Sequence, residues 1–158
     1  MENKRVLVAV AVVIAVTVLS ITLWELVVRD MFADESTEYS ISISYEGTER
    51  ERIRMSELEG LPEHSYKDVL GSGTNDSGPL VRDVILLRID PSELSNDTMI
   101  MFESSLTLQK RTLSWAELAN ESNIYILDFT KRGTVKFTSP DTPKNQRVKD
   151  VTNIQVGV

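Results

Sequence analysis

The sequence predicts a small α+β domain, mainly β, that follows a single N-terminal transmembrane helix. Three observations predict this arrangement: an apolar run at residues 6–28, short segments in which apolar and polar residues alternate, and helix-start signals between those segments. Beyond the apolar run the 158-residue chain keeps roughly 125 residues, which is enough for one domain with one core.

The apolar run at 6–28 predicts a membrane-spanning helix. As a helix it would be about 34 Å long, slightly more than a hydrocarbon core of about 30 Å. Trp24 and Glu25 stand near its far end, where they suit the lipid headgroups, and Lys4 and Arg5 stand immediately before it. The positive-inside rule therefore predicts a cytoplasmic N-terminus and a cell-membrane protein whose C-terminal part is extracytoplasmic.

These assignments divide the chain into four parts. Residues 1–5 are a cytoplasmic stub, 6–28 the transmembrane helix, 29–37 a polar tether, and 38–158 the outer domain. Two alternatives remain open. A cleaved signal peptide would have a shorter apolar core and a small-residue cleavage site. A pilin-like or surface-layer segment would be clipped near Arg5.

Charge and composition exclude several function classes. From Asp30 onward the chain has 22 acidic and 14 basic residues, a net charge near -8. Such a surface repels nucleic acid and anionic lipid, so no nucleic-acid partner is expected. The absence of cysteine excludes disulfides, thiolate zinc sites, iron–sulfur clusters and a cysteine nucleophile.

In the first half of the outer domain, residues 38–45 alternate strictly and predict a half-buried strand. Residues 49–55 follow as an edge or hairpin partner. Ser56 and Glu59 have the spacing of a capping box that opens a short helix. Another strand is possible at 64–70, and the stretch GSGTNDSGP at 71–79 predicts a loop.

The second half is expected to begin with a helix at 80–89, with Pro79 in its first turn. Residues 98–103 and 106–111 predict a strand pair, and Ser114 with Glu117 predicts a second capping box. Apolar segments predict a hairpin at 124–130 and 134–139, and an apolar pattern at 147–158 ends the chain.

No residue set gives a clear catalytic or metal-binding motif. His64 is the only histidine, so it cannot form a metal site without carboxylates or serve a convincing serine hydrolase triad with Ser72, Ser77, Ser104 or Ser105. Gly71-Ser72-Gly73 lacks the lysine of a phosphate loop and is interpreted as a flexible connection. Asp90, Glu93 and Asp97 could collect calcium, but their spacing favours a solvated acidic loop.

Three sequons are candidate glycosylation sites, each in an expected loop or element end. They begin at Asn75, Asn96 and Asn120. An outward-facing domain is where glycans could be attached, although Asn-Asp-Ser clusters are also ordinary turn formers.

The order of these elements resembles the molybdopterin-binding domain of sulfite-oxidase-like oxidoreductases. The resemblance is collinear over nearly the whole outer domain, and each piece is short. The matching segments are IRMSELEGLP (53–62), GPLVRDVIL (78–86), RTLSWAEL (111–118), IYILDF with the turn at Gly133 (124–133), FTSP (137–140) and VKDVTNIQV (148–156).

The resemblance implies a molybdenum-ligating cysteine after the "lp" stretch, and this chain has none between His64 and Gly73. It also implies arginines and histidines that grip the pterin phosphate, for which there are no convincing counterparts. We therefore expect a fold without cofactor or metal, and fold alone then does not carry function.

The resulting hypothesis is a membrane-anchored, non-enzymatic outer domain that binds a membrane or envelope protein, or takes part in an assembly. The alternative is an oxidoreductase accessory subunit that binds a pterin or another small ligand.

Overall fold

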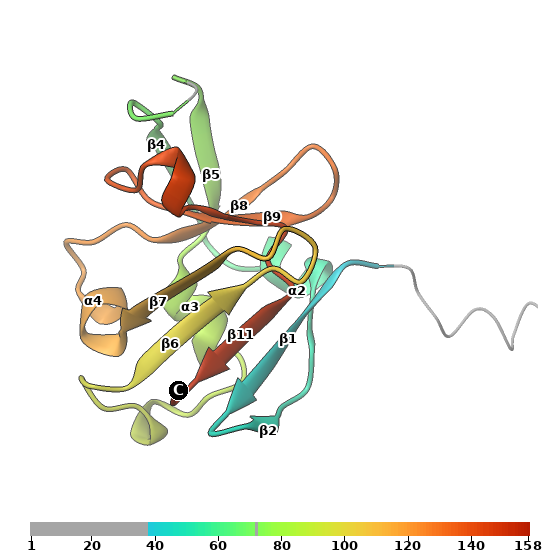
Figure 1. Ribbon diagram of the computed structural model, residues 1–158, viewed down its shortest axis with the longest axis vertical. Helices are drawn as coiled ribbons and strands as arrows, with labels where there is room; N and C mark the ends of the chain where they lie inside the picture. The colour runs from blue at the N-terminus through green and yellow to red at the C-terminus, as the bar shows by residue number, and fades with distance from the viewer. Residues whose placement is uncertain (1–37, 72) are drawn as a thin grey trace, which may run out of the picture. The chain divides into compact units, whose positions relative to one another are not determined.

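The structure, a computed structural model, describes residues 38–71 and 73–158, which form a mainly β domain with short helices, as predicted (Figure 1). Its strands form one large mixed sheet, one three-stranded sheet and a separate hairpin. The predicted stub, span and tether at 1–37 lie outside the described residues. None of the helices in the described part has the length and apolar character needed to cross a membrane.

The large sheet has the strand order β2-β1-β11-β6-β7, with β3 also paired to β1. Its first and last strands in the chain, β1 and β11, are parallel, whereas the other neighbours are antiparallel. The parallel pairing brings the two ends of the domain side by side. The strand bounds are β1 (Ser40–Tyr45), β2 (Thr48–Glu49), β3 (Ile53–Arg54), β6 (Met99–Glu103), β7 (Lys110–Ser114) and β11 (Asn153–Val156).

Strand β1 confirms the predicted alternation. Ile41 and Ile43 are fully buried, and the intervening serines are only partly buried. The predicted partner of β6 was wrong in position, because β7 begins at Lys110 rather than at 106. Residues 104–109 instead form a turn, in which the Ser104 amide donates to the Gln109 carbonyl at 3.0 Å.

The three-stranded sheet has the order β10-β9-β8 and contains the predicted hairpin (β8, Ile126–Phe129; β9, Val135–Thr138; β10, Val148–Lys149). The remaining hairpin pairs β4 (Glu63–Lys67) with β5 (Asn75–Pro79). The prediction of one loop over 71–79 was therefore wrong, since its second half is a strand. Pro79 ends β5 and does not open a helix; at a strand end its missing N–H costs no ladder bond in the sheet interior.

The helices are short: α2 (Met55–Glu59), α3 (Val81–Leu86), α4 (Trp115–Ala119), and the 3₁₀ turns η1 (Pro91–Glu93) and η2 (Lys144–Gln146). The capping box of Ser114 and Glu117 is confirmed at 2.9 and 3.2 Å. The one predicted at Ser56 was wrong. Helix α2 starts directly after β3, so Arg54 is the N-cap and Glu57 accepts its amide hydrogen at 2.9 Å.

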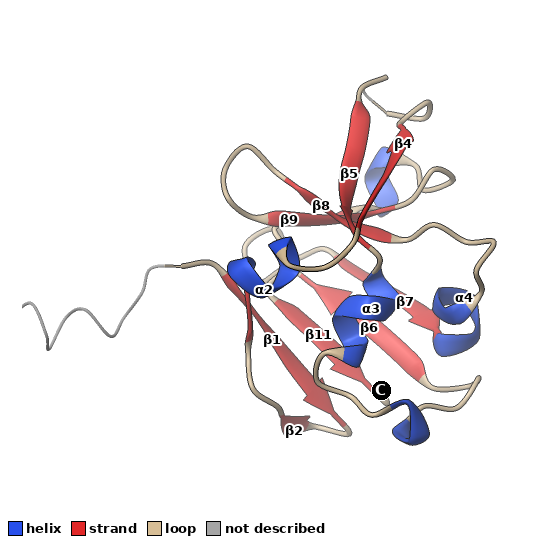
Figure 2. Ribbon diagram, turned by 180° about the vertical axis from the view of Figure 1, so that it is seen from behind, coloured by secondary structure: helices blue, strands red, loops and turns tan. Residues whose placement is uncertain are grey.

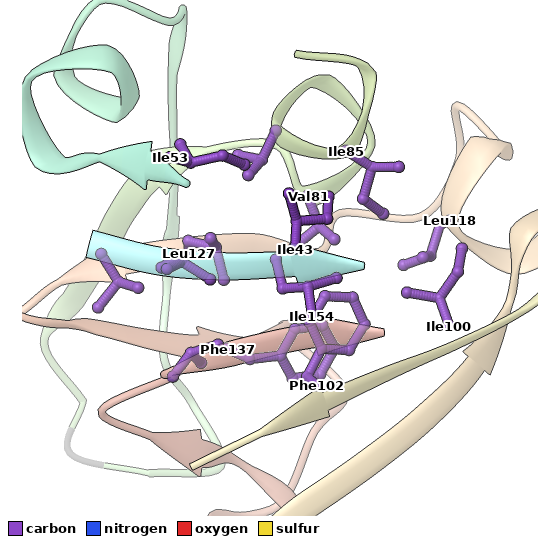
Figure 3. Packing of buried hydrophobic residues seen from close by; sticks show 14 of the residues in the cluster. Ile43, Ile53, Val81, Ile85, Ile100, Phe102, Leu118, Leu127, Phe137 and Ile154 are labelled. Atoms are coloured by element: carbon purple, nitrogen blue, oxygen red, sulfur yellow. The ribbon is translucent and has the colours of Figure 1, made fainter. Parts of the chain in front are cut away.

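The core lies between the large sheet and the layer of helices. Figure 2 shows α3 across one face of the sheet, with α2 and α4 to either side. Val81 and Ile85 of α3 pack above Ile43 of β1 (Figure 3). Phe102 of β6 stacks on Phe137 of β9 with ring centroids 4.5 Å apart, which joins the large sheet to the small one.

Gly78 is where β5 crosses β8 most closely. A Cβ at this position would overlap the carbonyl oxygen of Leu127. Because that oxygen is backbone, it cannot move aside cheaply, and we expect Gly78→Ala to lower the free energy of unfolding by about 3 kcal/mol. Urea unfolding of the full chain in detergent micelles measures this.

Gly60→Ala is the matched control. Gly60 has φ −78°, and a Cβ there would meet the Glu57 carbonyl oxygen at 3.4 Å, an ordinary van der Waals distance. It should change stability by less than about 1 kcal/mol. Equal effects of the two substitutions would contradict the close crossing of β5 and β8.

Candidate functional site: an ion-pair cluster behind the β4–β5 hairpin

Charged side chains from five separate segments meet where the β4–β5 hairpin crosses the small sheet. The cluster consists of three carboxylates and two cations, namely Asp68, Asp76, Asp128, Lys136 and Arg147. All five are largely removed from solvent. They come from residues spread over some 80 positions, so no local motif could have revealed them.

The pair of Asp68 and Arg147 is the most buried part of the cluster. The two guanidinium Nη atoms donate to the two carboxylate oxygens at 2.7 and 2.6 Å, a bidentate geometry. Asp68 is 1% exposed and Arg147 is 4% exposed. The hydrogen bonds to Asp68 raise the pKa of Arg147 above its ordinary value, so this residue stays charged.

Lys136 joins the other two carboxylates. Its Nζ lies 3.1 Å from Asp76 and 3.0 Å from Asp128. Asp128 also accepts the backbone N–H of Ser77 at 2.8 Å, which ties β8 to β5. The hydroxyl of Tyr66 on β4 donates to Asp76 at 3.4 Å and also lies 2.8 Å from the Thr138 hydroxyl.

Two glycines of the hairpin tip lie close to Asp68. Gly71 passes so near Asp68 that a Cβ would overlap the carboxylate, and Gly73, with φ +74°, donates its N–H to the Asp68 carbonyl. The interpretation of 71–73 as a merely flexible connection is thus incomplete, because Gly71 is needed for a close contact. Val69 and Leu70 lie 70% and 53% exposed at this tip.

This arrangement is built for structure rather than for proton transfer or nucleophilic attack. The cluster's carboxylates and cations bond one another, so each cation already has an anionic partner. The stability of the domain therefore depends on every member of the cluster, because a buried charge that loses its partner is destabilising by several kcal/mol. The cluster therefore fixes the hairpin against the small sheet.

The structure does not combine His64 with a serine nucleophile. His64 is exposed on β4 and pairs with Gly78, whereas Ser77 pairs with Ser65. Neighbouring strand positions point to opposite faces, so His64 and Ser77 face apart. Ser104 is buried and accepts the Thr107 N–H, and the Ser105 N–H donates to Thr152; Ser72 lies outside the described residues.

The acidic loop at 90–97 forms a helix cap. Asp90 accepts the Ser92 N–H at 2.8 Å, and Glu93 accepts the Asp90 N–H at 3.1 Å. Glu93 also pairs with Arg50 at 2.8 Å. Over residues 38–71 and 73–158 no group of three or more His, Asp or Glu side chains is placed to hold a metal. Asp97 is exposed in the following turn.

All three sequon asparagines are exposed. Asn96 lies in a turn and Asn120 is the C-cap of α4, which agrees with the prediction that both lie in a loop or at the end of an element. Asn75 does not lie in a loop, because it is the first residue of β5. Glycosylation stays a prediction. The membrane-interface candidates Lys4, Arg5, Trp24 and Glu25 lie outside the described residues.

No protein-family model matches the chain, and no curated protein matches it. The function is therefore inferred from the chain's own residues.

We predict that Asp68→Asn lowers the free energy of unfolding by about 3–5 kcal/mol, because the buried charge of Arg147 loses its bidentate partner and keeps only Asp76, 3.8 Å away. Urea unfolding is the measurement. The surface pair of Glu49 and Arg52, with side chains 63% exposed, provides the control. Glu49→Gln should cost at most about 1 kcal/mol. A small effect at Asp68 would show that the pair does not hold the hairpin.

Stability should also fall at alkaline pH. Burial raises the pKa of Tyr39 to about 12 and also raises that of Tyr66. An unfolded tyrosine ionises near pH 10, so the unfolded chain loses these protons first. The stability contribution is complete below pH 10 and is lost as the pH rises towards the folded pKa values. Urea unfolding at pH 8 and pH 11 should show this loss, with a smaller loss in Tyr66→Phe. Equal stability of the parent at both pH values would refute it.

Proposed function

We propose that this chain is a membrane-anchored protein whose extracytoplasmic domain has a non-catalytic binding or assembly role. The observation that carries the proposal is the buried pairing of Asp68 with Arg147, because it commits the charges behind the hairpin to structure. The apolar run at 6–28, with Lys4 and Arg5 before it, supports the anchor and its orientation.

The domain is, on this proposal, a cofactor-free relative of the sulfite-oxidase-like molybdopterin-binding domains. Four of the six segments that carry the resemblance each span two consecutive elements: 53–62 spans β3 and α2, 78–86 the end of β5 and α3, 111–118 β7 and α4, and 148–156 β10 and β11. Such agreement of segment and element supports a shared chain path. The segment at 64–73, where the family's cysteine is expected, corresponds to β4 and the hairpin tip.

The residues at this position do not fit a molybdenum cofactor. The chain has no cysteine to ligate the metal. An anionic pterin phosphate needs unpaired cations, but Arg147 and Lys136 face three carboxylates. The formal charge of the cluster, two cations and three anions, is −1 and would repel the phosphate.

The hairpin tip is the proposed contact with a protein partner. Val69 and Leu70 expose apolar side chains at a position that the buried cluster holds in place. A preorganised contact loses less entropy on binding than a mobile loop does, so a small apolar tip on a fixed hairpin can contribute usefully to affinity.

The test begins with the full chain in its native membrane, carrying a C-terminal epitope. We expect the protein to resist alkaline extraction, the epitope to be accessible from outside intact cells, and the mature N-terminus to retain Lys4 and Arg5. Lys4→Glu with Arg5→Glu should increase the fraction with inverted orientation, because it removes the cytoplasmic positive charge. Lys144→Glu, within the outer domain, should not.

The metal and pterin content of the purified protein tests the non-catalytic role. We expect no stoichiometric molybdenum and no pterin. Stoichiometric molybdenum would overturn that role in favour of the oxidoreductase alternative. Release at alkaline pH would overturn the anchor, and cleavage near Arg5 would favour a filament component.

A further inference from the structure

Two leucines project from a firmly held turn between β6 and β7. Leu106 is 73% exposed and Leu108 is 82% exposed. The turn is not a loose loop: the Leu108 N–H donates to the Ser104 carbonyl at 2.9 Å, and the Thr107 N–H donates to the Ser104 hydroxyl at 3.1 Å. The turn therefore presents two apolar side chains to solvent in a defined position.

Leu108 also has an unfavourable backbone conformation for its residue type. Its φ is +58°, in the left-handed region that glycine and asparagine occupy most readily. A leucine here costs stability and contributes no core packing. The described residues leave this side chain in solvent, which points to a contact outside the domain.

This turn lies at the end of the large sheet where the chain enters the domain. Strands β1 and β11 are parallel, and β6 runs antiparallel to β11, so the start of β1 and the end of β6 share one end of the sheet. Two bonds join the neighbouring segments: the Ser105 N–H donates to Thr152, and the Tyr39 hydroxyl donates to the Val151 carbonyl. Figure 1 shows the start of β1, the β6–β7 turn and the β8–β9 turn on the same side.

Exposed cations lie on the segments that neighbour this turn. Thr107 donates to the Lys149 carbonyl at 3.3 Å, Arg132 of the β8–β9 turn binds Asp150, and Lys131 precedes it. We call Leu106, Leu108, Lys110, Lys131, Arg132 and Lys149 the tether-side surface.

Three carboxylates on the neighbouring segments already have partners. Glu103 pairs with Lys110, buried Asp150 pairs with Arg132, and Glu38 accepts the Ser56 N–H. The ion pairs of the described residues leave Lys131 and Lys149 exposed and available. This local balance differs from that of the outer part as a whole, which is near −8.

We propose that the tether-side surface rests on the bilayer, with Leu106 and Leu108 entering the headgroup–acyl boundary and Lys131 and Lys149 facing anionic headgroups. The inference rests on the proposed membrane anchor. Apolar side chains flanked by cations are the chemistry of interfacial membrane binding. Charges act over only about 8–10 Å at physiological salt, so the local surface decides the contact with the bilayer. The acidic faces elsewhere on the domain are repelled by anionic headgroups, which opposes other orientations.

Because the chain before the domain is short, the tether-side surface needs only a low intrinsic affinity for the bilayer. Nine residues at 29–37 separate the predicted span from Glu38. Fully extended they reach roughly 30 Å, so the domain would stay close to the bilayer. Such confinement makes docking an intramolecular event, for which effective concentrations reach the millimolar range. Two leucines and two lysines then need little intrinsic affinity.

The absence of native cysteine permits a direct test. Leu106→Cys, Leu108→Cys and Val158→Cys each give one labelling site in the full chain. Val158 is the matched control: it is apolar, 56% exposed, and lies by Met99 at the opposite end of the sheet. Each variant carries an environment-sensitive fluorophore and is reconstituted into phosphatidylcholine vesicles with or without phosphatidylglycerol, containing nitroxide-labelled lipid as quencher.

We expect several-fold stronger quenching and a blue-shifted emission at 106 and 108 compared with 158. Phosphatidylglycerol should strengthen the difference, and Lys131→Glu with Lys149→Glu should weaken it. Leu108→Gly in the Leu106→Cys background should reduce quenching at 106 while the melting temperature holds or rises, because glycine relieves the left-handed backbone. That stability readout excludes misfolding as the cause.

Equal quenching at all three sites would overturn the inference. A blue shift at 106 and 108 without lipid quenching would also overturn it, since the leucines would then contact a second copy or another protein. These results are distinct from failure of the anchor, which alkaline extraction of the same vesicles detects separately.

Discussion

The parallel pairing of β1 with β11 is the constraint on which the rest of this domain depends. It joins the beginning of the domain to its end, with Ile43 opposite Ile154 at the centre of the core. A pairing over so long a sequence separation requires a large loss of chain entropy, which the buried apolar side chains around it must offset. Strands β6 and β7 continue the sheet from β11, and the helices cover one face of it.

A second, polar constraint sets the hairpin. The stacked rings of Phe102 and Phe137 hold the small sheet against the large one, but they do not orient β4 and β5. That orientation comes from Asp68 and Arg147 together with the close crossing at Gly78. Ion pairs of this kind are poor sources of net stability, because desolvation opposes the attraction. Their effect here is geometric, because they fix the orientation of the hairpin that has Val69 and Leu70 at its tip.

The two proposed surfaces follow from these two constraints. The tether-side surface exists because the parallel pairing of β1 and β11 places the first residues of the domain at the same end of the sheet as the turn that follows β6. The hairpin tip exists because the ion cluster anchors β4 and β5 on the small sheet. One is apolar and basic, and the other is apolar above a buried network of mixed charge. Their different chemistry suits a lipid surface and a protein partner, respectively.

The sequence by itself determined the local features of this protein. The alternation in β1, the capping box at Ser114, the hairpin of β8 and β9 and the mainly β composition all depend on residues a few positions apart, so they could be predicted. Only the tertiary structure decided what joins distant positions. Asp68 and Arg147 are 79 residues apart, and the sequence around each of them does not indicate its partner. Likewise, Asn75 and Pro79 are typical turn residues, but they lie in β5 because the strand pairs with β4. The pattern around Leu106 and Leu108 predicted a strand, whereas the hydrogen bonds of Ser104 place both residues in a turn.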